Sequence, residues 1–235
     1  GTNFTLIYFA LKMKFHKILK NDEFKWYLSS IISVILLLTL LLSLNNNISF
    51  LNAFRKVSFQ VVSIITTTGY ATADYTTWGY FMSFIFFLFL FSGGSAGSTS
   101  GGIKIVRIII IIKNGLLEFK RRLHPKAVIP VMLNGSAISN QIIYNLLAFI
   151  FLYLFIFTVG SILLTALGVD FLTSISAVAS AVGNVGPGIA QVGPSYSFDH
   201  IPLLGKWILS LLMLMGRLEL FTVCLIFTPY FWKRI

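Results

Sequence analysis

The chain has 235 residues, of which 57% are hydrophobic and only 11% are charged, and its mean hydropathy is +0.88. Soluble domains carry about 25% charged residues, so this composition excludes a soluble globular protein and predicts an all-α polytopic membrane protein. The net charge of +11 does not indicate a nucleic-acid partner, because the basic residues lie at the ends of apolar runs and form no patch beside exposed aromatic side chains. A single cysteine, Cys224, allows no disulfide within the chain.

Residues 1–27 are basic, with five lysines opposed by Asp22 and Glu23. This pattern is typical of a cytoplasmic segment. Residues 28–44 carry no charge, and at about 1.5 Å per residue they nearly cross a hydrocarbon core of about 30 Å. They predict the first membrane span. The chain starts at Gly1 without a leader pattern, and we expect it to begin within a longer protein.

A short apolar segment follows the first span and ends in a polar turn. Residues 51–65 are too few to cross the bilayer, and residues 66–71 then read Thr-Thr-Thr-Gly-Tyr-Ala. Irregular backbone survives at membrane depth only where protein buries it or water lines it. The run resembles the carbonyl-lined filter of potassium channels, and Gly69 supplies the backbone freedom that such a turn needs. Taken by itself, it fits an ordinary external turn equally well.

The next apolar region, residues 75–112, is too long for one crossing and is interrupted near its middle. The interruption, residues 92–102, consists of eleven small residues with five glycines. Each glycine disfavours a helix by about 1 kcal/mol relative to alanine. We therefore expect the second span to break inside the membrane at this glycine-rich loop.

The second half of the chain repeats this order. A basic connector, residues 113–137, predicts a second cytoplasmic segment. No charge occurs over the 43 residues from position 127 to 169, which predicts an interfacial entry helix and then a span over about residues 138–167. A short apolar helix is expected over residues 171–182, followed by a second turn, and a last span over residues 202–229. The expected units are residues 1–27, 28–112, 113–137 and 138–235.

The distribution of basic residues supports this topology. Of the 18 lysines and arginines, 14 fall in the parts placed on the cytoplasmic side, which are residues 1–27, residues 101–126 and the C-terminus with Lys233 and Arg234. Three, Arg55, Lys56 and Lys206, are placed on the outer side of the membrane, and Arg217 alone lies within a span. Both ends of the chain are thus predicted to be cytoplasmic.

The two turns match in position. Gly69 and Gly186 are 117 residues apart, and Thr67-Thr68-Gly69-Tyr70 aligns with Asn184-Val185-Gly186-Pro187. Each turn follows a short helix whose C-terminal end is partially negative, so two such ends directed at one place favour a cation. The repeat predicts a pore lined by backbone carbonyls from both turns.

These two turns, the broken second span and the closing run from Gly216 to Glu219 resemble the TrkH/KtrB potassium transporters over essentially the whole chain. The chain is similar to the third and fourth of the four span-loop-span units of that family. The resemblance implies a potassium pathway in a bacterial plasma membrane, a homodimer, a cytosolic nucleotide-binding regulatory ring of the TrkA/KtrA kind, and no cofactor beyond the transported K⁺. Membrane lipid is the alternative partner for basic residues 113–126.

The resemblance also assigns site residues. Backbone oxygens of the filter are implied at Thr67, Thr68, Gly69, Tyr70, Asn184, Val185 and Gly186, with K⁺ held by all of these except Tyr70. An intramembrane gate is implied at Gly93, Gly94, Gly97, Ser98, Gly101 and Gly102, with Arg217 projecting into the pore beside it. An arginine at mid-membrane costs about 2.5–3.5 kcal/mol and needs partners or water. A structural ion pair of Arg217 with Glu219 is the competing interpretation.

Other chemistries fit the sequence poorly. The run from Gly97 to Lys104 differs from a phosphate-binding loop in the place of its lysine, and no histidine lies in a span beside the loop serines to serve a protease. Clustered metal ligands are missing, and Glu219 is the sole acid within a span that could carry protons. Three alternatives stay open: a non-conducting scaffold or sensor on the same fold, a Na⁺-permeable relative, and a half-pore completed either by a longer chain or by a second copy.

Overall fold

The structure, a computed structural model, describes residues 1–46, 48–218, 220–226 and 228–232. Glu219, Lys233 and Arg234, for which the sequence predicts roles or a location, lie outside the described residues. The fold is mostly helical, as predicted. Within the described part, two helices are long and apolar enough to cross a membrane, and a bent pair makes a third candidate.

The first unit begins with two short helices and one long one. α1 (Phe4–Leu11) and α2 (Phe15–Leu19) precede α3 (Asp22–Asn46), the first span candidate. α4 (Phe50–Ile65) returns toward the middle of the molecule and packs along α3. Its 16 residues span about 24 Å at 1.5 Å each, so it does not cross a bilayer.

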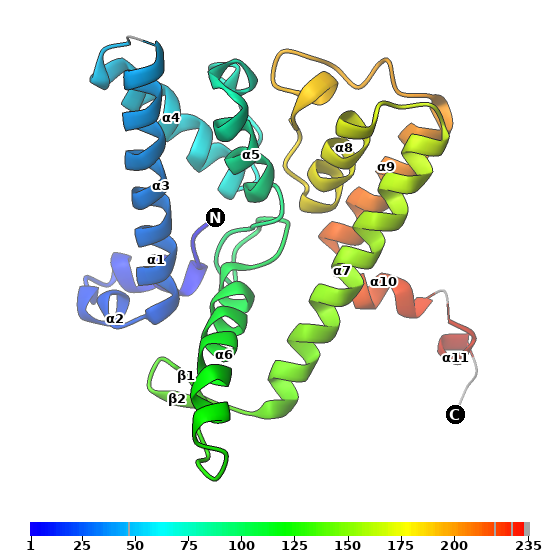
Figure 1. The fold of residues 1–235 in the computed structure, drawn as a ribbon. Coiled ribbons are helices and arrows are strands. Elements are labelled where there is room, and N and C mark those ends of the chain that lie inside the picture. Colours follow the sequence, from blue (N-terminus) through cyan, green and yellow to red (C-terminus); the bar gives the residue numbers. More distant parts are fainter. Residues whose placement is uncertain (47, 219, 227, 233–235) are drawn as a thin grey trace.

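The second span of this unit is broken where the glycines predict a break. After the 3-10 helix η1 (Tyr75–Trp78), α5 (Tyr80–Phe89) ends before the glycine-rich loop, and α6 (Ile105–Leu123) starts after it. Figure 1 shows this loop in the centre of the molecule, between α5 above and α6 below.

A β-hairpin occupies the place of the predicted interfacial entry helix, so that prediction was wrong. β1 (Val131–Leu133) pairs antiparallel with β2 (Ser136–Ile138) across Asn134 and Gly135. Both turn residues have positive φ, 50° and 79°, as a tight two-residue hairpin turn requires. The Asn-Gly pair is a local signal for a hairpin turn, but the lack of charge around it led to the prediction of a helix.

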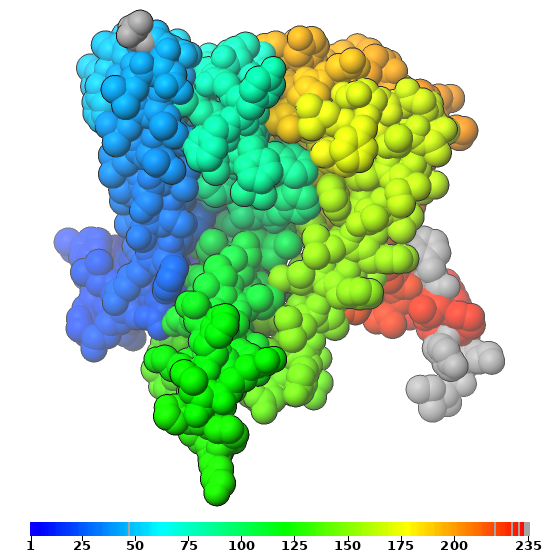
Figure 2. All heavy atoms as spheres, viewed as in Figure 1, coloured from blue at the N-terminus to red at the C-terminus, as the bar shows by residue number. Residues whose placement is uncertain are grey.

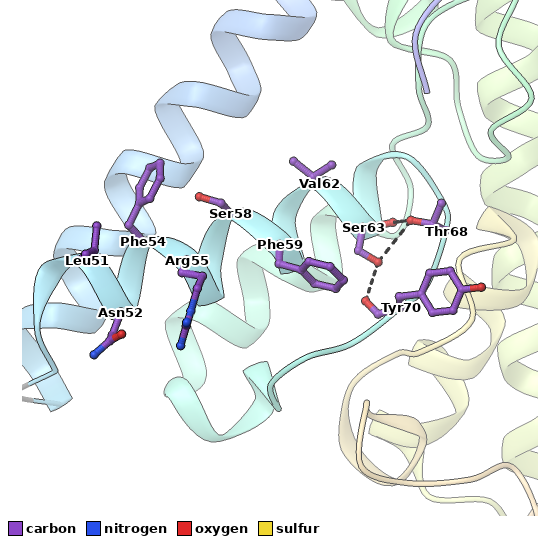
Figure 3. A pocket seen from close by; sticks show the side chains of 10 residues that line it. All are labelled: Leu51, Asn52, Phe54, Arg55, Ser58, Phe59, Val62, Ser63, Thr68 and Tyr70. Atoms are coloured by element: carbon purple, nitrogen blue, oxygen red, sulfur yellow. Dashed lines mark hydrogen bonds between the residues drawn. The ribbon is translucent and has the colours of Figure 1, made fainter.

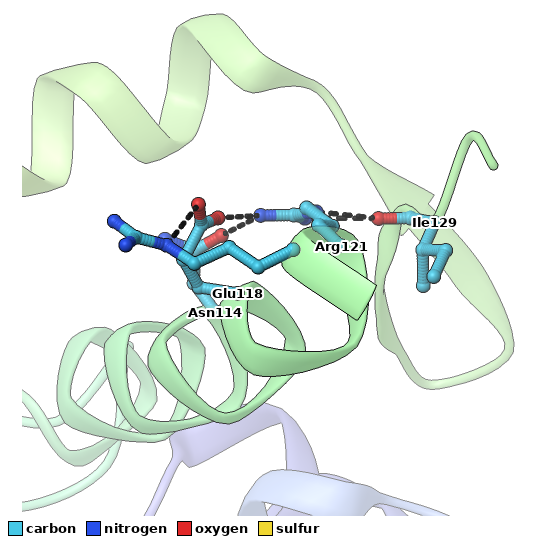
Figure 4. Close-up of polar contacts among 5 residues, drawn as sticks. Asn114, Glu118, Arg121 and Ile129 are labelled. Carbon is cyan, nitrogen blue, oxygen red and sulfur yellow. Dashed lines mark hydrogen bonds and ion pairs between the residues drawn. The ribbon is translucent and has the colours of Figure 1, made fainter. Parts of the chain in front are cut away.

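The hairpin contacts the start of α3 and the last part of α6. The sequence predicts that both of these helix ends are cytoplasmic. Asp22 and Asn134 exchange two hydrogen bonds between backbone N–H and side-chain oxygen, at 2.7 and 2.8 Å. Arg121 donates to the carbonyl of Ile129 at 2.9 Å and to Asn114 at 2.8 Å, and it also contacts Glu118 (Figure 4). This end of α6 projects beyond the rest of the surface in Figure 2.

The second unit repeats the long helix and the short helix of the first unit, and it differs in its last span. α7 (Asn140–Ala166) is the second long span and α8 (Phe171–Gly183) the second short helix, followed by η2 (Ala190–Val192). The predicted last span is not straight: α9 (Leu203–Arg217) and α10 (Leu220–Ile226) are bent by 116° at their junction, and α11 (Pro229–Trp232) follows. Gly216, a poor helix former, lies in the last turn of α9 beside this bend.

The described residues form three hydrophobic clusters, and each of the two largest is centred on one unit. One core joins α3, α4 and α5 around Leu38, Val61 and Phe86, and the other joins α7, α8 and α9 around Leu164 and neighbouring residues. The first cluster also includes Ala179, Val185 and Ile189 of the second unit, so the two units pack against each other. They place the C-terminal ends of α4 and α8 on either side of the region above the glycine-rich loop (Figure 1).

Candidate functional site

The two turns that follow α4 and α8 share one backbone hydrogen-bond pattern. The N–H of Thr68 donates to the carbonyl of Ser63, and 117 residues later the N–H of Val185 donates to the carbonyl of Ser180, both at 3.0 Å. Thr67 and Asn184, which correspond in the same way, have φ of 55° and 54°. The repeat read from the sequence is therefore a repeat of backbone conformation.

The left-handed conformation of Thr67 is unusual for a β-branched residue, and positions of this kind cost about 1–3 kcal/mol. Its hydroxyl accepts a hydrogen bond from the N–H of Gly101 in the glycine-rich loop at 3.0 Å. The strained conformation thus places the Thr67 hydroxyl against the loop.

A serine in the last turn of each short helix holds the turn that follows. Ser63 donates to the carbonyl of Tyr70 at 2.6 Å, and Ser180 donates to the carbonyl of Gly186 at 2.7 Å. Each serine lies six residues before the glycine of its turn, at Gly69 or Gly186. Both serines are buried, so these bonds are shielded from competing water.

The two turns approach each other at their glycines. A Cβ added to Gly69 would lie 2.1 Å from the carbonyl oxygen of Val185, and one added to Gly186 would lie 3.9 Å from the Cα of Gly69. Gly69 has φ of +74° and Gly186 of +113°, in the region that favours glycine. Only glycine at position 69 permits this separation.

The glycine-rich loop closes on itself and leaves little room for side chains. Its neck is formed by the N–H of Gly93 donating to Ile103 and the N–H of Ile103 donating to Phe91, at 2.8 and 2.9 Å. A Cβ on Gly93 would lie 2.0 Å from the carbonyl oxygen of Gly101. The two arms therefore pack backbone against backbone.

Gly101 brings this loop against both turns at once. Its N–H binds Thr67 of the first turn, and a Cβ at this position would lie 2.4 Å from the carbonyl oxygen of Gly183 and 2.8 Å from the Cβ of Asn184. Of the other predicted gate residues, Gly94 is buried, Gly97 is exposed, and Ser98 and Gly102 are half-buried.

Two charged side chains that the sequence analysis did not single out hold the loop. Glu23, buried at the start of α3, accepts a hydrogen bond from the N–H of Ala96 at 2.6 Å. Lys104 donates to the carbonyls of Ser98 and Ser100 at 3.1 and 2.5 Å. The available signal was a carboxylate in the first turn of a membrane span, where burial requires a partner.

Arg217 lines a cavity of about 320 Å³ beside the loop, together with Lys104, Arg107 and residues 98–100. It is exposed to this cavity. The hydrogen bonds from a cationic side chain to loop carbonyls that the structure describes come from Lys104, and within the described residues no such bond from Arg217 is found. The arginine predicted for the pore thus lies near the loop without holding it.

A groove of about 810 Å³ runs along α4 to the first turn (Figure 3). Its lining includes Leu51, Phe54 and Phe59 along the helix, and Thr68 and Tyr70 at its end. Tyr70 is 74% exposed. One side of the first turn is therefore uncovered in this chain.

Comparisons with known proteins agree with this architecture. A family model described as TrkH, a cation transport protein, matches residues 1–234. Trk system potassium uptake proteins TrkH of Halomonas elongata and of Escherichia coli K12 are 36% and 34% identical over 92% and 100% of this chain. They are covered over 44% and 48% of their own lengths, so the chain spans about half of these relatives.

A solved structure gives the same result. The crystal structure of the potassium transporter TrkH from Vibrio parahaemolyticus matches with a TM-score of 0.90 and 35% identity, over 98% of this chain and 50% of that one. The broken span, the paired short helices and the two glycine turns are thus the shared fold of a membrane transporter. This chain belongs to the TrkH family of cation transport proteins.

Proposed function

We propose that this chain forms half of a potassium uptake pathway across the bacterial plasma membrane, in which the two turns are the filter and the glycine-rich loop is the gate. The observation that carries the proposal is the position of Gly101, whose backbone contacts Thr67 of one turn and the Gly183–Asn184 backbone of the other. When the loop is closed against the inner end of the filter, it blocks an ion that has passed through the filter. Relatives named as potassium uptake proteins support K⁺ as the ion.

The physical basis is charge and desolvation. α4 and α8 each end at a turn, so the partially negative C-terminal ends of two helices lie beside the proposed ion path. Backbone oxygens of Thr67, Thr68, Gly69, Asn184, Val185 and Gly186 would replace the hydration shell of K⁺. On the cytoplasmic side, Arg217 in the cavity beside the loop repels a cation until loop and arginine move aside.

The remaining wall of the pore has to come from outside this half. The groove along α4 leaves the first turn open on one side, next to Thr68 and Tyr70. Two further units covering this groove would enclose the filter. We further propose a homodimer, a cytosolic nucleotide-binding ring that acts on the loop, and a topology with both chain ends cytoplasmic.

Uptake of K⁺ or Rb⁺ in cells lacking other uptake systems tests the filter. Gly69→Ser and Gly186→Ser are expected to lower the preference for K⁺ over Na⁺, because each puts a side chain on a positive φ at the filter. Gly79→Ser is the matched control, since Gly79 has φ of +116° with nothing within 4 Å of an added Cβ. Unchanged selectivity in both filter variants contradicts the proposal and favours a scaffold or sensor role.

A further inference from the structure

Tyr75 reaches from the first repeat into the second. It is the first residue of η1, which begins shortly after the first turn, and its side chain is fully buried. Its hydroxyl donates to the carbonyl of Gly188, 113 residues later, at 2.6 Å. Gly188 lies two residues after Gly186.

The segment that Tyr75 contacts is already held from the other side by α8. Ser180 donates to the carbonyl of Gly186 at 2.7 Å and accepts from its N–H at 3.1 Å, and Ser176 accepts from the N–H of Ile189 at 2.5 Å. Both serines are buried. The Tyr75 hydroxyl thus ties this backbone, through Gly188, to the first repeat.

The tyrosine ring itself has little freedom. Its centroid lies 4.5 Å from that of Phe86, and Trp78 packs edge-on to the same phenylalanine at 5.8 Å. The neighbouring Asp74 accepts hydrogen bonds from the N–H and hydroxyl of Thr76 at 2.9 and 2.5 Å. A ring fixed in this way transmits the position of one repeat to the other.

The contact has no counterpart in the opposite direction. The residue 117 positions after Tyr75 is Val192, whose side chain has no hydroxyl to donate, and whose carbonyl accepts from the N–H of Gly188. The repeat is therefore asymmetric at this position, and the hydrogen bond from the Tyr75 hydroxyl joins the repeats in one direction only.

We propose that Tyr75 is a specificity-determining positioning residue: its hydrogen bond to Gly188 fixes the second turn relative to the first and so sets the width of the filter between them. The inference rests on the proposed filter function. Without the hydroxyl, the carbonyl of Gly188 loses a buried donor, and the turn gains freedom to fit Na⁺.

Tyr75→Phe removes only the hydroxyl and is tested in the full-length transporter in cells. The expected result is a fall of about three- to tenfold in the ratio of K⁺ to Na⁺ uptake, with K⁺ flux retained. Tyr153→Phe is the matched control, because the Tyr153 hydroxyl is buried and has no hydrogen-bond partner among the described residues. It is expected to leave the ratio unchanged.

Two outcomes overturn the proposal: an unchanged ratio in Tyr75→Phe, or an equal fall in Tyr153→Phe. If Gly69→Ser and Gly186→Ser lower the ratio while Tyr75→Phe does not, the positioning role fails and the filter stands. If none of the three lowers it, the filter itself fails. Should Tyr75→Phe not reach the membrane, Phe86→Leu keeps the hydroxyl but loosens the ring, and an unchanged ratio there contradicts the proposal.

Discussion

The N–H of Ala96 in the glycine-rich loop donates to the carboxylate of Glu23 on α3 at 2.6 Å, and this bond joins two segments 73 residues apart. The preceding residue, Asp22, exchanges two hydrogen bonds with Asn134 at the tip of the β-hairpin. Two consecutive acids in one helical turn thus contact the loop and the hairpin. The start of α3 thus connects the hairpin to the proposed gate.

Removal of the Glu23 carboxylate is expected to open the gate. A hydrogen bond to a charged group contributes about 1.5–3 kcal/mol, so Glu23→Ala should raise basal K⁺ flux about tenfold, and Glu23→Gln, which keeps an acceptor oxygen, should raise it less. Glu118→Gln is the control, because that carboxylate is half exposed on α6. Wild-type flux in a correctly inserted Glu23→Ala protein contradicts the role.

Gly101→Ala is expected to displace the loop from the turns. The added methyl would lie 2.4 Å from the carbonyl oxygen of Gly183, a separation that the backbone cannot accommodate without movement. Flux should rise by an amount similar to that of Glu23→Ala. Gly115→Ala, on α6 with nothing within 4 Å of its added Cβ, should leave flux unchanged. Normal flux from both Gly101→Ala and Glu23→Ala would show that the position of the loop does not limit transport.

Arg217→Ala is expected to raise K⁺ flux, because it removes a positive charge from the cavity beside the loop. The rise should be about severalfold and should shrink at high ionic strength, where charges are screened. Arg122→Ala is the control, since its side chain is 82% exposed on α6. Partial deletion of residues 92–102 should act in the same direction. A lower or equal rate in well-folded Arg217→Ala protein counts against an electrostatic barrier.

Titration of Asp74 is expected to leave the ratio of K⁺ to Na⁺ uptake unchanged between about pH 5.5 and about pH 8. Burial raises the pKa of this carboxyl, but hydrogen bonds from Thr76 and Ser195 outweigh it and hold the pKa below its ordinary value of 3.8. A carboxyl with a depressed pKa contributes its stabilisation fully above the unfolded pKa and loses it only as pH falls through the folded one. The ratio of K⁺ to Na⁺ uptake across this range checks it, and a decline toward pH 5.5 would contradict it.

Sequence patterns alone predicted the membrane class, the two units and the positions of both glycine turns. Those features depend on local properties: uninterrupted apolar length sets a span, glycines break a helix, and a spacing of 117 residues relates equivalent positions. α4 ends at Ile65 and α8 at Gly183, at or within one residue of the positions that the hydropathy predicts.

The side chains that hold the loop and join the repeats could be identified only from their contacts in the folded chain. Glu23, Lys104 and Tyr75 act on backbone groups 73, 4–6 and 113 residues away, and the identity of a backbone acceptor or donor leaves no trace in the sequence. The β-hairpin shows that a local signal can be present in the sequence without deciding the structure. Its Asn-Gly signal was present, but a long uncharged run fits a helix or a strand equally well until a partner strand and the start of α3 select one.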